Sequence, residues 1–256
     1  MVLAREDVVR AVDEWLWVPD DAERVDTPDG VLVRWPAWFE HPASLVRFHP
    51  VGDPAKALEG FCDRTRAWGA DRLQVWVTMD ADPGLDDVAR AAGGVHEETL
   101  AVLALDLHAP RPDLGTWPDL ELRRDDRDLA THGDYYRLNA EVFGGSMPSE
   151  EELSASLARQ VPEQLSVIVY DAGRAVGSGG ITVAGDVARL WGGCTLEEAR
   201  GRGVYRAVLD ARLRAGDEHG CRMALVKGNT ATSGPILRRA GFTAYGEERL
   251  FQVPLG

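Results

Sequence analysis

Two parts of the sequence carry the same order of features, and this repetition constrains the fold more than any single motif. Each part has the pattern of a helix that ends at a glycine, a short apolar strand, a second helix stopped by Ala-Gly, and a strand that begins with two acidic residues. The matching positions are Gly69 and Gly220, Ala92-Gly93 and Ala240-Gly241, and Glu97-Glu98 and Glu247-Glu248. An offset of about 150 residues between equal features indicates an internal repeat of α/β type, with coincidence among common elements as the alternative.

Hydrophobic spacing predicts alternating helices and strands in both halves. The first half has predicted helices at 5–18, 54–68 and 85–92, and predicted strands at 30–35, 43–49, 73–77 and 100–107. The second half has predicted strands at 120–122, 165–170, 175–183, 187–195, 223–226 and 242–254, and predicted helices at 129–143, 150–159, 204–219 and 233–239.

A proline-containing stretch without periodicity separates the two halves at His108 to Pro118, and this composition is typical of a linker. We therefore predict a first domain at 1–110, a linker at 111–118 and a second domain at 119–256. A chain of 256 residues is long enough for both domains to bury a core.

The composition limits the classes of partner. The formal net charge is −14, from 42 acidic and 28 basic residues, which argues against nucleic acid as a partner. No apolar run approaches the roughly 20 residues that a membrane span needs, and the N-terminus lacks a signal-peptide pattern, so we expect a cytoplasmic protein without membrane association. Three cysteines that are far apart, Cys62, Cys194 and Cys221, predict neither a disulfide framework nor a metal site.

A glycine-rich turn, Arg200-Gly201-Arg202-Gly203, directly precedes the predicted helix that starts at Val204. The free backbone N–H groups and the dipole at a helix N-terminus attract anions, and two arginines add positive charge. This stretch predicts a phosphate site, with an ordinary helix start flanked by exposed arginines as the alternative.

The same turn, extended to Tyr205, resembles the Arg/Gln-x-x-Gly-x-Gly/Ala signature of the GNAT acetyltransferase family, which binds the pyrophosphate of acetyl-CoA. Two further landmarks of that family occur in the right order, a hairpin segment at Ala175-Val176-Gly177 and a helix end at Gly241-Phe242. The resemblance covers Leu114 to Gly256. It departs from the family pattern at Tyr205, where a small residue is usual, and at Leu237, where a tyrosine is common.

The resemblance implies the fold class and the cofactor site. The expected fold is α/β (α+β, GNAT-like), with two similar lobes that each have a mixed, mainly antiparallel twisted sheet flanked by helices. The first lobe would be degenerate and without a cofactor turn, and the second would bind acetyl-CoA as cosubstrate, with no metal. The implied cofactor-binding residues are Cys194, Thr195, Leu196, Arg200, Gly201, Arg202, Gly203, Val204, Tyr205, Arg206, Asn229 and Ser233.

Catalytic residues follow less directly from the sequence. An amine must lose its proton before it attacks the thioester, and the oxyanion needs a backbone N–H donor near Cys194 to Leu196. Glu141 and Glu197 are candidates to remove the proton through water, and Tyr136 is a candidate to donate a proton. The alternative is that both glutamates are ordinary surface acids and that Tyr136 has only a packing role. Cys194 has no adjacent histidine to activate it, so we do not expect a covalent acyl-enzyme.

We therefore predict direct transfer of an acetyl group from acetyl-CoA to a primary amine, most readily of a small molecule, in a ternary complex formed by a monomer or homodimer. One alternative is a non-catalytic acyl-CoA sensor or interaction module. A further alternative is a structural pseudo-enzyme in which Tyr205 fills the cofactor site.

Overall fold

The protein is described by a computed structural model that covers residues 3–110, 113–125 and 128–256, so Arg111 and Pro112 of the predicted linker lie outside the described residues. The chain divides into two compact units. Unit 1 contains Ala104–Lys227 and Arg238–Thr243 with a short N-terminal piece. Unit 2 contains Arg5–Leu103, Gly228–Leu237 and Ala244–Gly256. β5 (Val95–Asp106), β10 (Met223–Asn229), α7 (Ser233–Arg239) and β11 (Thr243–Pro254) have residues in both units.

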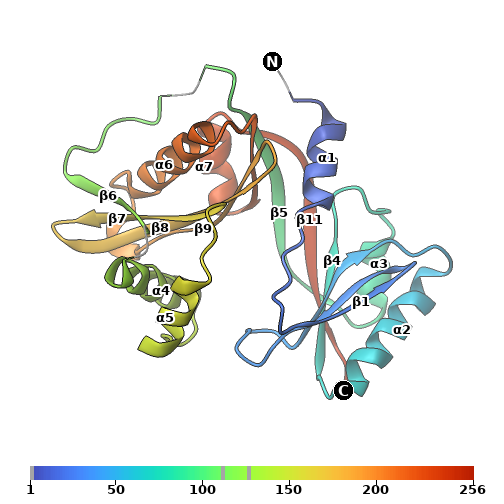
Figure 1. The fold of residues 1–256 in the computed structure, drawn as a ribbon. Coiled ribbons are helices and arrows are strands. Elements are labelled where there is room, and N and C mark those ends of the chain that lie inside the picture. The colour runs from blue at the N-terminus through green and yellow to red at the C-terminus, as the bar shows by residue number, and fades with distance from the viewer. Residues whose placement is uncertain (1–2, 111–112, 126–127) are drawn as a thin grey trace. The chain divides into compact units, whose positions relative to one another are not determined.

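Unit 2 is a twisted sheet with helices packed on it (Figure 1). Its strands are β1 (Glu23–Thr27), β2 (Gly30–Arg34), β3 (Ala43–Phe48), β4 (Arg72–Val77), β11 (Thr243–Pro254) and β5, hydrogen-bonded in the order β1-β2-β3-β4-β11-β5. β3 and β4 are parallel, whereas β1–β2, β2–β3 and β4–β11 are antiparallel. The helices of this unit are α1 (Arg5–Asp13), α2 (Pro54–Ala67) and α3 (Leu85–Ala91).

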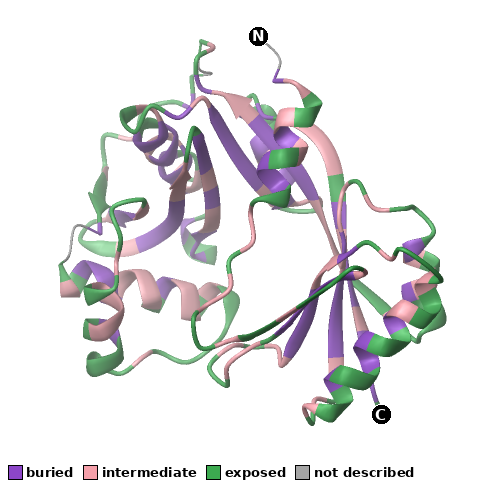
Figure 2. Cartoon of the chain, turned by 45° about the vertical axis from the view of Figure 1, so that its right-hand side comes forward, coloured by how far each residue is buried: buried purple, intermediate pink, exposed green. Residues whose placement is uncertain are grey.

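The core of unit 2 lies between its sheet and the helices α2 and α3. Leu58 and Phe61 of α2 and Leu85 of α3 are buried against Leu45 and Val75 of the strands. Figure 2 shows these strands as largely buried, whereas α2 alternates between buried and exposed residues. The spacing of the apolar residues along α2 therefore orients the helix on the sheet.

The last strand, β11, lies in unit 2 from Ala244 onward, although the sequence boundaries assign it to the second domain. Arg249 pairs with Val77 and Pro254 with Arg72, which makes β11 the antiparallel neighbour of β4. The compact units therefore differ from a division of the chain at a single linker. The backbone groups at one edge of β4 need partners, and β11 supplies them.

Unit 1 also contains a mixed, mainly antiparallel sheet. Its strands are β6 (Leu120–Arg124), β7 (Gln164–Asp171), β8 (Arg174–Ala184), β9 (Val187–Thr195), β10 and the end of β5, in the order β5-β10-β9-β8-β7-β6. The pair β9–β10 is parallel, and the pairs β6–β7, β7–β8 and β8–β9 are antiparallel. α6 (Val204–Glu218) covers one face, and α4 (Leu129–Phe143) and α5 (Glu150–Ala158) cover the other (Figure 1). The predicted fold class is confirmed.

Glycines on β8 let α6 approach the sheet closely. A Cβ atom at Gly177 would lie 2.5 Å from Cγ1 of Val204, and one at Gly179 would lie 2.8 Å from Cγ1 of Val208. The two glycines share one face of the strand and the two valines share one face of the helix, because strand side chains alternate and helix positions four apart align. Larger residues on this face of β8 would push α6 away.

Several boundaries differ from the sequence predictions. β1 was not predicted, because its residues are polar and all of them are at least partly exposed. α1 ends at Asp13 instead of residue 18, and β5 begins at Val95 instead of residue 100. In the described part of the chain, no helix is long and apolar enough to cross a bilayer.

Candidate functional site

The strands β9 and β10 separate at the centre of unit 1. They pair only over Val187–Leu190 and Met223–Val226, and β9 then continues to Thr195 without further pairing to β10. A bulge in the β8–β9 pair accompanies this separation, at the point where Gly192 has a φ of +59°. The bulge bends β9 away from its parallel neighbour and leaves one edge of β9 open.

The open edge of β9 presents the backbone of Thr195. The N–H of Leu196 donates to the carbonyl of Val176 at 2.9 Å, and Thr195 lies opposite Gly177 in the antiparallel register. Because hydrogen-bonded and non-hydrogen-bonded pairs alternate, the N–H and C=O of Thr195 point away from β8. Of the predicted stretch from Cys194 to Leu196, Thr195 therefore has the free backbone groups, whereas the N–H of Leu196 is occupied.

The glycine-rich turn follows β9 directly. A 3-10 turn at Glu197–Ala199 leads into Arg200–Gly203, and α6 begins at Val204. Gly203 is the N-cap residue with a φ of +87°, and no side chain of residues 3–110, 113–125 or 128–256 caps the first turn of α6. The first N–H groups of α6 therefore have neither a helical partner nor a capping partner, as the sequence predicted for an anion site.

Gly203 is needed for a second reason, because Trp117 lies directly against it. A Cβ atom at position 203 would lie 2.3 Å from Nε1 of Trp117. Trp117 falls in the predicted linker, where no role was expected for it. In the structure its indole lies beside the glycine-rich turn and packs on the core that contains Val204.

The arginines of the turn are in different environments. Arg202 forms an ion pair with Asp171 at the end of β7, with an N–O distance of 2.6 Å. Arg200 and Arg206 are exposed, and Gly201 has a φ of +76° with open space where a Cβ atom would lie. Positive charge for an anion at this turn is therefore available from Arg200 and Arg206, while Asp171 competes for Arg202.

Tyr205 turns under β9 instead of covering the turn. Its Cε2 atom lies 3.4 Å from the position that a Cβ at Gly193 would take, and the guanidinium of Arg212 contacts the same position at 3.0 Å through Nη2. Tyr205, which stands where the family signature has a small residue, therefore lies beside the β9 bulge.

Arg212 is a buried cation that sequence reasoning missed. It is 1% exposed, and its Nη1 donates to the carbonyl of Trp191 at 3.3 Å, whereas Nε and Nη2 have no hydrogen-bond partner among the described residues. Burial lowers the pKa of the Arg212 guanidinium, and the neighbouring Tyr205 opposes that shift. Its sequence signal was its spacing, because Val204, Val208 and Arg212 follow one another at intervals of four on the buried face of α6.

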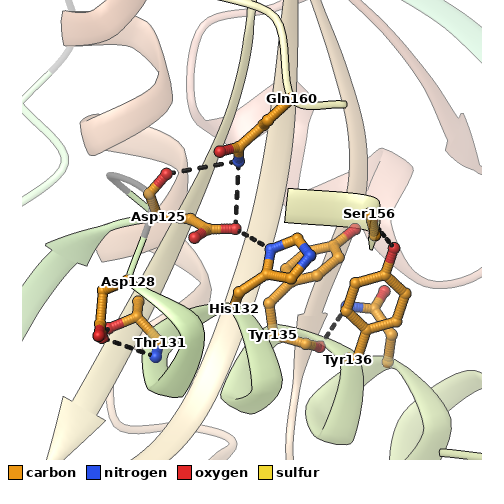
Figure 3. A network of polar contacts seen from close by, with 9 residues as sticks. Asp125, Asp128, Thr131, His132, Tyr135, Tyr136, Ser156 and Gln160 are labelled. Atoms are coloured by element: carbon orange, nitrogen blue, oxygen red, sulfur yellow. Dashed lines mark hydrogen bonds and ion pairs between the residues drawn. The ribbon is translucent and has the colours of Figure 1, made fainter. Parts of the chain in front are cut away.

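A second buried polar cluster lies on the opposite face of the sheet, at the start of α4 (Figure 3). Nδ1 of His132 is 2.5 Å from Oδ2 of Asp125, and the amide of Gln160 donates to the same carboxylate oxygen at 3.2 Å. Both members of the pair are buried, and within the part of the chain that the structure describes Oδ1 of Asp125 and Nε2 of His132 have no partner. No sequence motif predicts this pair, because its members come from a strand end and a helix.

The two neighbouring tyrosines of α4 differ in position (Figure 3). The Tyr136 hydroxyl hydrogen-bonds with Ser156 at 2.8 Å, which links α4 to α5. The Tyr135 hydroxyl lies 3.5 Å from the position that a Cβ at Gly192 would take, and burial raises the pKa of Tyr135. Of the two, Tyr135 is therefore the tyrosine beside the β9 bulge, whereas Tyr136, the predicted proton donor, holds two helices together.

The predicted carboxylates lie apart from Tyr136. Glu141 is half-exposed and lines a surface pocket together with Arg174 and Leu196. Glu197 is exposed on the 3-10 turn. Arg174 also forms an ion pair with Glu198 at 2.7 Å. Because Leu196 follows directly after β9 and lines the same pocket, Glu141 lies near the end of β9.

The remaining predicted residues have defined surroundings. Asn229 and Ser233 belong to unit 2, where the amide of Asn229 donates to Glu98 at 3.2 Å and its side-chain oxygen accepts from the N–H of Ala231 at 2.9 Å. The Cys194 thiol is buried beside Ser178, and burial raises its pKa, which opposes a nucleophilic role.

Comparisons with known proteins concern the family and the fold. Residues 130–242 match the model of the acetyltransferase (GNAT) family. Among solved structures, the chain is similar to a GCN5-related N-acetyltransferase from Kribbella flavida, with a TM-score of 0.73, 17% identity and coverage of 100% of this chain and 97% of that chain. A GCN5-related N-acetyltransferase from Sphaerobacter thermophilus gives a TM-score of 0.70 at 19% identity, with 98% and 85% covered.

A tandem GNAT protein from the clavulanic acid biosynthesis pathway gives a TM-score of 0.62 at 17% identity, with 97% of this chain and 88% of that chain covered. At these identities the structural likeness shows the fold alone. No match was found among curated proteins.

Proposed function

Through residues 130–242 the chain belongs to the acetyltransferase (GNAT) family, and we propose that it transfers the acetyl group of acetyl-CoA to a primary amine of a small molecule. The observation that carries this proposal is the open edge of β9 at Thr195, which leads within a few residues to the uncapped start of α6. The pantetheine arm of acetyl-CoA is extended and leads to a pyrophosphate. Such a ligand needs a strand edge to pair with, followed by an anion site.

The residues of the turn fit the pyrophosphate. The N–H groups of Val204, Tyr205 and Arg206 would donate to its oxygens, and the exposed Arg200 and Arg206 would supply charge. Gly201 and Gly203 hold positive φ angles that other residues rarely adopt, which keeps the backbone close to the ligand. The C=O of Thr195 would accept a hydrogen bond from an amide N–H of the pantetheine arm.

The chemistry follows from these positions. The amine nitrogen attacks the thioester carbonyl carbon, and the N–H of Thr195 is the free donor on this stretch for the oxyanion. Glu141 and Glu197 remain our candidates to accept the amine proton through water, and Tyr136 remains the predicted proton donor. Tyr135, whose hydroxyl lies at the bulge, is a further candidate to contact the acceptor.

A thermal-shift experiment with acetyl-CoA tests the cofactor assignment. A ligand at about 100 times its Kd stabilises a protein by about 2.7 kcal/mol, so we expect a clear rise in Tm. An amine panel with detection of the released thiol then tests the transfer, with each amine alone as the control. No shift with millimolar acetyl-CoA would contradict the proposal.

A specific observation favours the alternative of a non-catalytic acyl-CoA sensor. The hydroxyl of Tyr136 is bound to Ser156 and Glu197 is exposed on the 3-10 turn, as expected for a packing tyrosine and a surface acid. A sensor would show the thermal shift but release no thiol with any amine.

A further inference from the structure

We propose that Arg212, together with the hydroxyl of Tyr205, forms an anion site for the sulfur of coenzyme A, where it holds the thiolate that forms when the thioester is broken. This inference rests on the proposed function and assigns the group that stabilises its leaving group.

The position of Arg212 follows from the direction of helix side chains. Long side chains on a helix point back toward its N-terminus, so Arg212 extends over Val208 toward Tyr205. Its guanidinium contacts two glycines of the sheet, because a Cβ at Gly179 would lie 3.0 Å from Cζ and a Cβ at Gly193 would lie 3.0 Å from Nη2. The absence of side chains at these two positions leaves the space that the guanidinium fills beside the β9 bulge.

The charge of Arg212 is not balanced by a neighbouring acid. The titratable groups that face it are Tyr205 on its own helix, Cys194 on β9 and Tyr135 on α4. Burial raises the pKa values of the Cys194 thiol and of the Tyr135 hydroxyl, so both are neutral near pH 7. In the described part of the chain, no ion pair joins Arg212 to a carboxylate.

Burying a charged guanidinium without a partner has a large free-energy cost unless an anion binds beside it. An anion that arrives with the ligand would supply the missing partner and the missing acceptors for Nε and Nη2. This indicates an anion site that is incomplete in the free protein.

The position of the Arg212 guanidinium along β9 indicates that the anion is the sulfur of coenzyme A. The pyrophosphate would bind at the start of α6, and the backbone of Arg212 is about 12 Å further along the helix axis, at 1.5 Å per residue from Val204, while its guanidinium reaches back to Gly193. Gly193, against which Nη2 packs, is two residues before Thr195, whose backbone faces the open edge. The acyl end of an arm that runs along this edge would therefore meet the guanidinium.

The reaction creates a negative charge at that end. The amine nitrogen forms a bond to the carbonyl carbon, the C–S bond breaks, and its electron pair remains on the sulfur, while the amine nitrogen releases its proton to water. The products are the amide and a coenzyme A thiolate, which the guanidinium and the Tyr205 hydroxyl hold through charge-assisted hydrogen bonds.

Binding of two ligands tests this site without any turnover. Coenzyme A has an ionisable thiol, whereas its S-methyl thioether is similar in size and has no proton to lose. An Arg212 cation would lower the pKa of the bound thiol below its free value, so coenzyme A would gain affinity as pH rises toward the free thiol pKa and the advantage would then level off. We expect calorimetry between about pH 6 and pH 9 to show about a tenfold preference for coenzyme A over the thioether at the upper end and none at the lower end.

Variants of the same helix separate this role from a structural one. Arg212→Met should abolish the pH-dependent preference while it changes thioether affinity less than about twofold, and it should keep or raise the Tm because it removes a buried unpaired charge. Arg212→Lys should retain part of the preference, and Tyr205→Phe should reduce it. Arg214→Met is the matched control, because Arg214 is exposed on α6 and pairs with Asp210.

Each result decides the question. Equal affinities for coenzyme A and the thioether at every pH, with both ligands bound, would overturn this inference and leave the proposed function intact. Binding of neither ligand would overturn both. If Arg212→Met does not fold, the Tyr205→Phe and Arg212→Lys proteins still show whether the preference depends on this pair.

Discussion

The helices α2 and α6 occupy equivalent places in the two units but begin differently. Each connects two parallel strands, β3 to β4 in unit 2 and β9 to β10 in unit 1. At the start of α2, the carboxylate of Asp53 accepts hydrogen bonds from the N–H groups of Ala55 and Lys56 at 3.0 and 3.4 Å, and Pro54 has no N–H. At the start of α6, Gly203 has no side chain and the N–H groups are left without a cap.

The N-cap residues of the two helices therefore differ in the donors that they leave for an anion. The Asp53 carboxylate occupies the donors of α2 and would repel a phosphate, whereas Gly203 leaves the donors of α6 available. Unit 2 therefore fits our proposal of a degenerate copy without a cofactor turn. Gly203→Asp should give α6 a capped start, and Asp53→Ala should remove the cap of α2.

The largest effect should come from Gly203→Asp, which gives α6 the type of cap that α2 has. The carboxylate would compete with the pyrophosphate, and position 203 also has a positive φ and contacts Trp117. We expect acetyl-CoA affinity to fall at least about 100-fold, or about 2.7 kcal/mol, by calorimetry.

Gly220→Asp is its control, because Gly220 follows the other end of α6 with a φ of +72° and has open space around it. It adds the same charge and a similar backbone strain. An equal loss of affinity in both proteins would mean that strain, and not competition at the helix start, explains the effect.

A smaller effect is expected from Asp53→Ala in α2. Loss of the cap should lower the free energy of unfolding by about 1 kcal/mol in urea titrations, and Asp53→Ser should restore most of it. Acetyl-CoA affinity should not change. A second molecule of acetyl-CoA bound to the Asp53→Ala protein would refute the view that unit 2 lacks a cofactor site.

The smallest effect should follow from Asp171→Asn, which releases Arg202 from its ion pair at the glycine-rich turn. An exposed pair of this kind contributes about 0.2–1 kcal/mol, so acetyl-CoA should bind about two- to threefold more tightly at low salt. The gain should disappear at high ionic strength. Asp210→Asn, which breaks the exposed pair with Arg214, should leave the affinity unchanged.

The sequence was sufficient to predict most elements of both sheets and the open start of α6, because local patterns determine them. Helix α4 and strand β9 have the predicted bounds, and Gly203 has the left-handed backbone that the turn requires. The partner of β11 could not be predicted, because β5 and β11 have similar acidic starts and apolar runs. A local pattern fixes which face of a strand is buried but not which edge it joins.

The polar residues of the core were also beyond the sequence. Arginine is a mostly exposed residue type and histidine one of intermediate burial, so the burial of Arg212 and His132 depends on contacts with distant segments. The pairing of His132 with Asp125 joins a helix to a strand end, and the space for Arg212 comes from glycines on two other strands. Spacing on α6 indicates that Arg212 faces the sheet, but only the structure shows that it has no acid beside it.

The position of β11 next to β4 determines when unit 2 can finish folding during synthesis. The side chain of Arg66 on α2 donates to the carbonyl of Leu255 at 2.9 Å across 189 residues of sequence, and β4 reaches its neighbour only after β10 and α7 have been made. On the ribosome, the edge of β4 would stay open while the intervening residues are translated, and such long-range pairing slows folding. The nascent chain thus has an exposed strand edge for most of translation, a state in which chaperone binding competes with aggregation.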